Sequence, residues 1–335
     1  MVLGAFNVES LSTSTPPYQW ILGGPLTIFV TFMFYGLMLL VIEDLVSRYS
    51  LDYRKLFLIG LIYGILEEGF LALTNELPNQ GFVGFGRYYG LNVPWAIITS
   101  EIHAIYTVVL TFIIVDLIIP REKMGPVLSK WQYVPVLAYL AILYLFVPNY
   151  LIEIASTRSS FASFAVLMSK PEFFLSNFFL INSVRVYPSW QSVAIQLIAI
   201  LVLSVLVIRL PKLKLNSSEK EFVSGKSYAI LLLLFGAMFW IPYLAQFFGG
   251  PDVLVVIYYL LLPPVFWRLI LSKIRRDRLF DLKKVATICL TLLLFFGGTG
   301  VFIYLMQRDL LSVIIIIAAL GIEVGLITRK YFSKK

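Results

Sequence analysis

The chain has 335 residues, of which 59% are hydrophobic and only 14% are charged, with a mean hydropathy of +0.88. An ordinary soluble domain carries about 25% charged residues, so this composition excludes that class. The net charge of +8 does not indicate a nucleic-acid partner, because most basic residues stand in short loops between apolar runs.

Apolar runs recur along the whole chain. A run of about 20 residues crosses a hydrocarbon layer of roughly 30 Å, and these runs lack the alternating pattern of a barrel strand. We therefore expect an all-α polytopic membrane protein with about nine transmembrane helices and the lipid bilayer as its surroundings. The expected spans are 20–42, 56–74, 94–119, 132–153, 191–210, 227–247, 253–271, 284–306 and 310–328.

The basic residues give the expected orientation. Every second loop is rich in Lys and Arg, which marks the cytoplasmic side. The N-terminus is therefore expected outside, retained without a signal peptide, and the C-terminus in the cytoplasm. The basic loops hold Arg48, Arg54 and Lys55; Arg121, Lys123 and Lys130; Lys212, Lys214, Lys220 and Lys226; Lys273, Arg275, Arg276, Arg278, Lys283 and Lys284; and Arg329, Lys330, Lys334 and Lys335. The alternate loops hold only Arg87, Arg158, Lys170, Arg185 and Arg308.

This pattern divides the chain into three parts. Residues 1–153 form a membrane domain with four spans, and residues 191–335 form a second with five spans. The apolar stretches of 154–190 are split by Lys170-Pro171-Glu172 into pieces too short to cross. We expect this segment to lie on the outer surface as an amphipathic element.

A group of ionisable residues lies within the second and third spans. They are Glu67, Glu68, Glu101 and His103, the last being the only histidine of the chain. Such groups cost roughly 2.5–3.5 kcal/mol each at a helix centre, so they usually serve a purpose. At about 1.5 Å per residue, both pairs lie roughly 9–14 Å below the outer edge of the membrane. Their equal depth on consecutive helices predicts that they meet.

Helical facing separates Glu101 from His103, because residues two apart point in nearly opposite directions. His103 shares a face with Tyr106 and Thr107, whereas Glu101 is expected nearer the outer interface, within reach of water or Arg87. We therefore predict Glu67, Glu68 and His103 as catalytic residues. The predicted binding residues are Glu101, Arg87, Tyr106 and Thr107.

A divalent metal is a possible cofactor, with Glu68 and His103 as its ligands if one is bound. A bis-histidine haem needs two histidines, so no haem is expected. Cys289 is the lone cysteine, which excludes an intramolecular disulfide and a cysteine metal site.

The last two spans contain a glutamate and several glycines for which the sequence predicts contacts. Glu323 lies near the inner edge and is expected to reach Arg329 or Lys330. The glycines at 297, 298 and 300 are expected to let the eighth span approach a neighbour closely, and Gly321 and Gly325 form a GxxxG pattern of helix packing.

The Glu67-Glu68 pair followed by a span with His103 resembles the type II CAAX-protease and bacteriocin-processing superfamily of intramembrane proteases. In that superfamily, glutamates and histidines position an attacking water, and the resemblance implies the same use here. This chain has Ala72 at the family's arginine position, Thr99 at its phenylalanine position and no second histidine.

The stretch from Gly64 to Pro120 more closely resembles an uncharacterised group of prokaryotic, largely archaeal, multipass membrane proteins. The shared features are Glu67-Glu68-Gly69, an outer loop around Gly84–Tyr89, the segment Gly90–Trp95, and His103-Ala104. The resemblance covers about a sixth of the chain. It implies that the outer loop belongs with the buried residues.

Three functions remain open from the sequence. The first is a membrane-embedded, protease-like hydrolase with Glu67 or Glu68 as general base and His103 as the group that orients water. The second is a proton- or cation-coupled transporter. The third is a non-catalytic subunit or assembly factor of a membrane complex, which would bind a protein partner through 75–93 or 154–190. The cell membrane is the expected location for all three.

Overall fold

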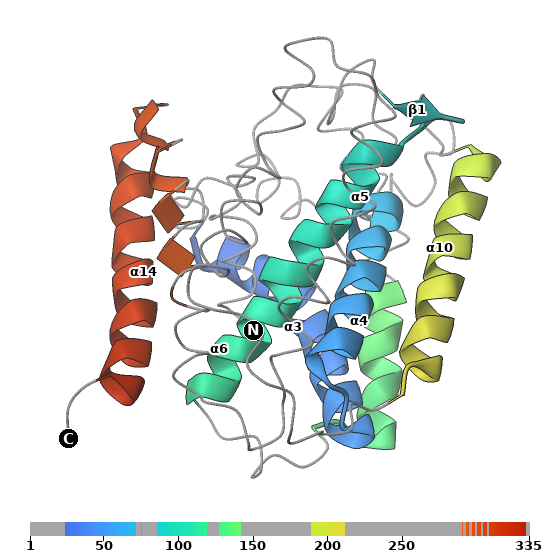
Figure 1. Cartoon of the computed structure of the whole chain (residues 1–335), viewed down its shortest axis with the longest axis horizontal. Coiled ribbons are helices and arrows are strands. Elements are labelled where there is room, and N and C mark those ends of the chain that lie inside the picture. Colours follow the sequence, from blue (N-terminus) through green and yellow to red (C-terminus); the bar gives the residue numbers. More distant parts are fainter. Residues whose placement is uncertain are drawn as a thin grey trace, which may run out of the picture.

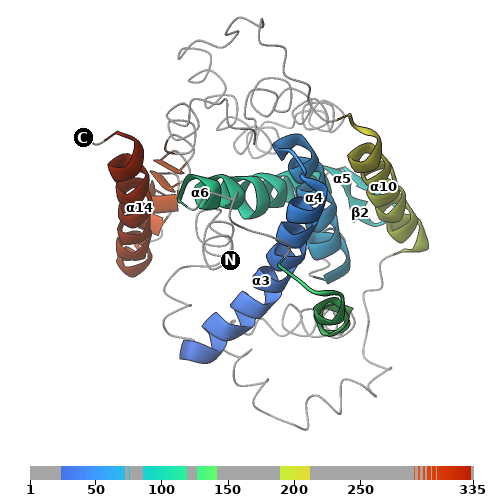
Figure 2. The ribbon, with the colours of Figure 1, turned by 90° about the horizontal axis from the view of Figure 1, so that it is seen from below.

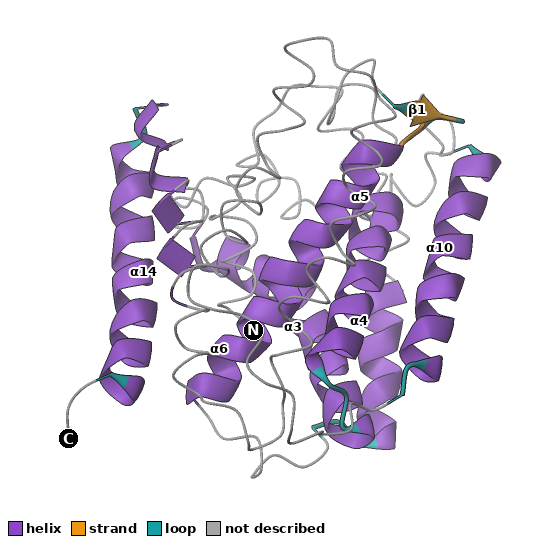
Figure 3. Ribbon diagram, viewed as in Figure 1, coloured by secondary structure: helices purple, strands orange, loops and turns teal. Residues whose placement is uncertain are grey.

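A computed structural model gives the fold of the chain (Figure 1). It describes residues 24–71, 75, 86–118, 127–141, 189–211 and 308–332, with part of 290–306. The described residues are mostly helical, and their one sheet is a small hairpin (Figure 3). An all-helical membrane architecture is the fold that the composition indicates.

Five of the expected spans coincide with helices. They correspond to α3 (Gly24–Tyr49); α4 (Tyr53–Ile65) with η2 (Leu66–Leu71); α5 (Val93–Ile102) with η3 (His103–Leu110) and α6 (Thr111–Ile118); α10 (Trp190–Arg209); and α14 (Leu310–Tyr331). The span expected at 132–153 is helical over 130–141, and the described residues of 290–306 are helical too. The spans expected at 227–247 and 253–271 and almost all of segment 154–190 lie outside the described residues.

Three described helices are long and apolar enough to cross a membrane: Val93–Val115, Trp190–Arg209 and Leu310–Lys330. The outer faces of two of them are apolar as well. On α10, Leu197, Ile198 and Leu201 are 52%, 60% and 64% exposed. Large apolar side chains exposed in this way suit a hydrocarbon environment and not water.

The helices begin where a side chain can accept the free N–H groups of the first turn. Asp52 accepts from the backbone N–H groups of Arg54 and Lys55 before α4. Asn92 does so before α5, where Pro94 suits the first turn. Ser189 and Asp309 occupy the same position before α10 and α14.

Helix α4 is the centre of the packing and contacts α5, η3 and α10. Figures 1 and 2 show α10 and α14 on opposite sides of this group, with α14 against α6. Gly60 and Gly64 allow the close approach to the third span. A Cβ at Gly60 would lie 2.6 Å from the Cα of Ala104, and one at Gly64 would lie 2.5 Å from the Cα of Ser100. Small residues four apart on both helices thus bring the two backbones together.

The hairpin precedes α5 and consists of β1 (Arg87–Tyr88) and β2 (Leu91–Asn92), which are antiparallel. Its two central residues, Tyr89 and Gly90, have φ of 52° and 87°. Positive φ at both positions is the backbone of a type I′ turn, whose twist matches that of the strands. The Ser189 hydroxyl donates to the Tyr89 carbonyl, which fastens the hairpin to the start of α10.

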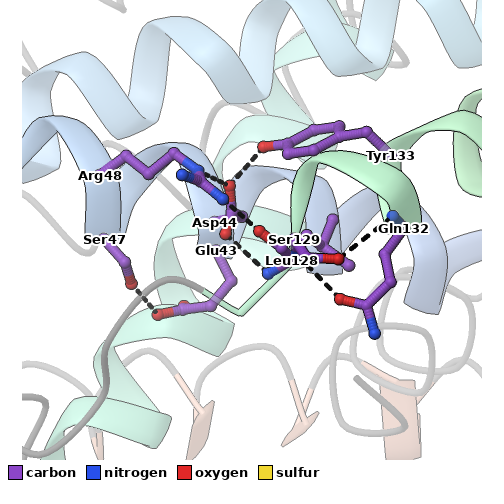
Figure 4. Close-up of polar contacts among 8 residues, drawn as sticks. All are labelled: Glu43, Asp44, Ser47, Arg48, Leu128, Ser129, Gln132 and Tyr133. Carbon is purple, nitrogen blue, oxygen red and sulfur yellow. Dashed lines mark hydrogen bonds and ion pairs between the residues drawn. The ribbon is translucent and has the colours of Figure 1, made fainter.

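A buried polar network joins the end of α3 to the helix at 130–141 (Figure 4). Asp44 is 0% exposed and accepts hydrogen bonds from Arg48, Tyr133 and the Leu128 backbone N–H. The Arg48 guanidinium also lies 5.8 Å from the ring centre of Tyr133. Burial alone would raise the pKa of Asp44, but these hydrogen bonds outweigh it and lower the pKa to about 2.

The helix at 130–141 begins with a capping box. The Ser129 backbone N–H donates to Gln132 Oε1 at 2.8 Å, and the Gln132 N–H donates to Ser129 Oγ at 3.4 Å. Each side chain thereby accepts from the other residue's backbone. Both bonds are visible in Figure 4 beside the Asp44 network.

The expectations for the last spans have mixed outcomes. A Cβ at Gly297 would lie 2.1 Å from Cδ1 of Leu320, so the close approach of the eighth span is confirmed and its neighbour is α14. Within the described part of the chain, nothing lies within 4 Å of a Cβ at Gly321 or Gly325. The expected contact of Glu323 with Arg329 or Lys330 is wrong. Glu323 is 3% exposed, and neither of its oxygens has a hydrogen-bond partner among the described residues.

Candidate functional site

The three predicted catalytic residues come from two segments of π-helix on neighbouring helices. Glu67 and Glu68 lie in η2, which extends α4, and His103 is the first residue of η3, which extends α5. In a π-helix the hydrogen bonds span one more residue than in an α-helix, which changes the direction of the following side chains, and such segments are frequent at functional sites.

The structure brings Glu67, Glu68 and His103 together, as their equal depth predicts. His103 Nε2 lies 3.0 Å from Glu68 Oε1. On the other side of the ring, Nδ1 lies 3.1 Å from Glu67 Oε2 and 3.1 Å from the hydroxyl of Thr107. We refer to Glu67, His103 and Glu68 as the triad.

Packing fixes the ring of His103. Tyr63 of α4 meets it edge-on, with the ring centres 5.5 Å apart and the planes at 84°. Gly64, one residue further, leaves room for His103, because a Cβ added at this glycine would lie 3.1 Å from the His103 Cβ. The close approach of the two helices is therefore what places the imidazole between the two carboxyl groups.

Two side chains of the triad are buried, and the third is partly exposed. The side chains of His103 and Glu67 are each 4% exposed, whereas that of Glu68 is 16% exposed. Glu68 is therefore the member that a small molecule reaches first.

The two ring nitrogens of His103 have different partners. Nε2 is hydrogen-bonded to Glu68 Oε1 at 3.0 Å, and Nδ1 is hydrogen-bonded to the Thr107 hydroxyl at 3.1 Å, with Glu67 Oε2 at ion-pair distance. A neutral imidazole has one N–H and one lone pair, so a neutral ring can donate to Glu68 and accept from Thr107. An imidazolium would instead have a carboxyl oxygen within 3.1 Å of each nitrogen. The site therefore suits a ring that gains and loses a proton.

The predicted binding residues divide into two groups. Thr107 is 0% exposed and belongs to the site through its bond with His103. Tyr106, 1% exposed, is buried in the same π segment, and its carbonyl accepts from Thr111.

The expectation for Glu101 and Arg87 is wrong. Glu101 is only 1% exposed, and its carboxyl oxygens have no hydrogen-bond partner in the described ranges. Arg87 instead donates to the Gly90 carbonyl across the hairpin turn. Helical facing gives no information on burial, and the carboxyl group of Glu101 is covered where exposure to the outer interface was expected.

A buried amide pair beside Glu68 was missed by the sequence analysis. The Asn75 N–H donates to the Glu68 carbonyl at 3.4 Å, and its side-chain Nδ2 donates to Gln196 Oε1 at 3.2 Å. Gln196 in turn donates to Ser192, and the Asn92 N–H donates to the Asn75 carbonyl at 2.8 Å. Asn75 thus connects the Glu68 turn, the hairpin and α10. The signal was the presence of Gln196 within an otherwise apolar span, which suggests a bond to another helix.

The residues of the site do not form a ready metal centre. Among the described residues, no group of three or more His, Cys, Asp or Glu side chains could hold a metal ion. The reason in the triad is geometric, since the two glutamates lie at different ring nitrogens. A metal on Nε2 would have Glu68 as its one carboxylate neighbour, whereas zinc usually takes at least three protein ligands.

In comparisons with known proteins, no family model matches the chain, and neither a curated protein nor a solved structure matches it significantly. The function is therefore inferred from the geometry of the site.

Proposed function

We propose that this is a multipass protein of the cell membrane with about nine spans, an outer N-terminus and a cytoplasmic C-terminus. Three apolar helices long enough to cross a bilayer support it, as do the exposed apolar faces of α10 and α14. The alternation of basic loops supports the orientation. The exposed Tyr88 and Tyr89 of the hairpin, with Trp190 nearby in α10, form an aromatic edge for the outer interface or for a protein partner at 75–93.

Within this frame we propose a membrane-embedded hydrolase of the protease-like kind. The observation that carries the proposal is the convergence of Glu67, Glu68 and His103 at 3.0 and 3.1 Å from two separate helices. Each of these residues is costly at membrane depth, and ionisable groups there commonly mark a functional site. The resemblance of the Glu-Glu and His positions to intramembrane proteases supports the same reaction class.

Each member has a role that follows from its place. Glu68 is the general base, because its side chain is the most exposed of the three. The proton that Glu68 removes from water is shared with His103 Nε2, and Glu68, as the exposed member, returns it to the leaving group. Glu67 and Thr107, at Nδ1, orient the ring and stabilise its charged form. The expected divalent metal has no part in this scheme.

A second function, a proton-coupled transporter, is favoured by another feature of the same contacts. Both ring nitrogens of His103 are already in contact with carboxyl groups, so the triad can load and release a proton without any substrate atom. The same residues would then alternate between two proton positions during transport.

One experiment separates the two functions. The full chain is reconstituted in lipid vesicles, and two signals are followed: cleavage of a fluorescence-quenched peptide library and acidification reported by a trapped pH-sensitive dye. We expect peptide cleavage that falls about 100-fold or more in Glu68→Gln. The conservative Thr107→Ser variant keeps the hydroxyl and should retain most of the activity. Proton uptake without cleavage in the wild type, or equal cleavage by Glu68→Gln, would overturn the hydrolase proposal.

A further inference from the structure

Gln196 is a buried polar residue of α10, the helix that lies beside α4 (Figure 1), and the proposed hydrolase does not use it. Its side chain is 3% exposed, whereas the next two residues, Leu197 and Ile198, are 52% and 60% exposed on the apolar side of the same helix. A polar side chain that is buried in an apolar helix is costly unless it makes hydrogen bonds. The partners of Gln196 therefore indicate its role.

Both polar atoms of the Gln196 amide are hydrogen-bonded. Its Oε1 accepts from Asn75 Nδ2 at 3.2 Å, and its Nε2 donates to the Ser192 hydroxyl at 3.3 Å. Ser192 lies one turn earlier on α10 and is 0% exposed, as is Asn75. These two bonds hold the amide in one direction, towards Asn75, which follows η2 in the chain.

Gln196 reaches the backbone beside Glu68 by two routes. In the first, its partner Asn75 donates a backbone N–H to the Glu68 carbonyl at 3.4 Å. In the second, the amide lies directly against Gly69, because a Cβ at this glycine would overlap Gln196 Oε1 and lie 2.7 Å from Cδ. The backbone of residues 68 and 69 is therefore held from α10 on both routes.

The direction of the Glu68 side chain depends on this backbone. Glu68 lies in η2, and its carboxyl group lies 3.0 Å from His103 Nε2 on a neighbouring helix. A functional contact of this kind needs surrounding hydrogen bonds that fix its members to within about 0.5 Å. Gly69 and Asn75 are the places where α10 supplies this support.

We propose that Gln196 is a positioning residue, which holds the turn of Glu68 so that its carboxyl group meets His103. The site then depends on α10, although all three members of the triad come from the second and third expected spans. The effect on catalysis rests on the proposed hydrolase, whereas the effect on the contact between Glu68 and His103 does not.

Two substitutions disturb the support from opposite sides. Gln196→Ala deletes the amide. Gly69→Ala pushes it aside, because the added methyl group overlaps the flexible end of the Gln196 side chain. The double variant has no overlap, since the space of the amide is empty, but it still lacks the amide. Gln191→Ala, at a half-buried position of α10, is the matched control.

The first measurement is nitrogen NMR of the full chain in lipid with a labelled histidine ring. His103 is the only histidine, so each ring signal belongs to one known nitrogen. We expect all three variants that lack the support to change the signal of Nε2, which faces Glu68, more than that of Nδ1, which faces Thr107. Gln191→Ala should leave both signals unchanged. An unchanged Nε2 signal in Gln196→Ala would overturn the proposal.

The second measurement is cleavage, in lipid vesicles, of a peptide that the wild type cleaves. We expect kcat to fall about 10-fold or more in the same three variants, because a displacement of about 1 Å at a reacting group can cost about 100-fold in rate. KM should stay nearly the same, because the lost contact acts on the chemical step. If the double variant recovers both kcat and the melting temperature relative to Gly69→Ala, the loss comes from packing alone, and the proposal is overturned.

The two measurements distinguish a failure of this proposal from a failure of the hydrolase. If the wild type cleaves no peptide while the Nε2 signal responds to Gln196→Ala, the hydrolase fails and the positioning of Glu68 is supported. If the wild type cleaves peptide and Gln196→Ala has the same kcat, the hydrolase is supported and the positioning role is overturned.

Discussion

At the scale of single residues, His103 keeps two carboxyl groups apart while it binds both. Removing the ring in His103→Ala leaves Glu67, 4% exposed, and Glu68, 16% exposed, without the group that bridges them. Breaking a buried pair in this way costs about 3–5 kcal/mol. We therefore expect a large fall in the melting temperature of His103→Ala, measured by thermal unfolding in lipid or mild detergent.

The control separates charge from lost volume. The triple variant His103→Ala, Glu67→Gln, Glu68→Gln has the same cavity but no carboxyl groups, so it should recover a large part of the lost stability. If the triple variant melts no higher than His103→Ala, the loss comes from packing alone and the triad has no electrostatic coupling.

The Asp44 network predicts that the stability of the protein falls at acid pH. Because the pKa of Asp44 is lowered from 3.8 to about 2 in the folded protein, its contribution to stability is full above about pH 4. It is lost as the pH falls from there towards 2. The melting temperature of the wild type should therefore fall over this range more steeply than that of Asp44→Asn, as followed by thermal melts at stepped pH. Parallel curves for the two proteins would contradict the assignment.

At the scale of helices, the glycines of α4 set the distance to the third span. A Cβ at Gly64 would lie 2.5 Å from the backbone of Ser100, and backbone cannot move aside as a flexible side chain can. Gly64→Ala should therefore force the helices apart and destabilise the protein by about 1–3 kcal/mol. Thermal unfolding measures the loss, and the same displacement should weaken the contact of His103 with Glu68.

Gly325→Ala is the matched control for this substitution. It places the same methyl group on α14, where nothing described lies within 4 Å. Alanine is the better helix former, so this variant should be neutral or slightly stabilised. Equal losses from Gly64→Ala and Gly325→Ala would show that the close approach is not important.

The bond between Asn75 and Gln196 holds α10 to the Glu68 turn. Gln196→Leu keeps the size of the side chain but removes the acceptor of Asn75 at 3.2 Å, within a site where both residues are at most 3% exposed. Leaving a buried amide without its partner costs about 1–3 kcal/mol, so the melting temperature should fall. Gln191→Leu, a half-buried position on the same helix, serves as the control and should change little. A similar loss at both positions would mean that any polar residue of α10 suffices.

At the scale of the whole molecule, the sequence predicts helices well and their contacts less well. Apolar periodicity and length indicate α10 and α14 to within a few residues, because a span is a local property. Equal depth also predicts the meeting of Glu67 and Glu68 with His103. The π segments that aim these side chains have no counterpart in the apolar pattern, since they depend on how α4 and α5 pack.

Burial by distant parts of the chain cannot be predicted from the local apolar pattern either. Glu101 was expected near water and Glu323 near the basic C-terminal residues, yet each is at most 3% exposed. Which faces of a helix are covered depends on neighbours far away in the sequence. The partnership of Asn75 with Gln196, 121 residues apart, is unpredictable for the same reason.

The orientation of the chain after residue 190 depends on one segment, 154–190. If it lies on the outer surface, the basic loop 212–226 and the C-terminus are both cytoplasmic, as the charge pattern requires. If it crosses once, both move outside, and the basic loops would then stand on both sides of the membrane. Single cysteines decide between these arrangements, because Cys289 is the only one to remove.

In a Cys289→Ala background, a membrane-impermeant maleimide applied to intact cells should label Tyr88→Cys, whose parent side chain is 48% exposed in the hairpin that we propose to lie outside. Ser218→Cys and Ser333→Cys should react only after the membrane is opened. Met124→Cys, in the loop after the third span, is inside under both arrangements and reports whether the cells are intact. Labelling of Ser218→Cys and Ser333→Cys from outside, with Met124→Cys protected, would mean that the segment crosses. The triad would then keep its outer depth, because the first four spans do not depend on it.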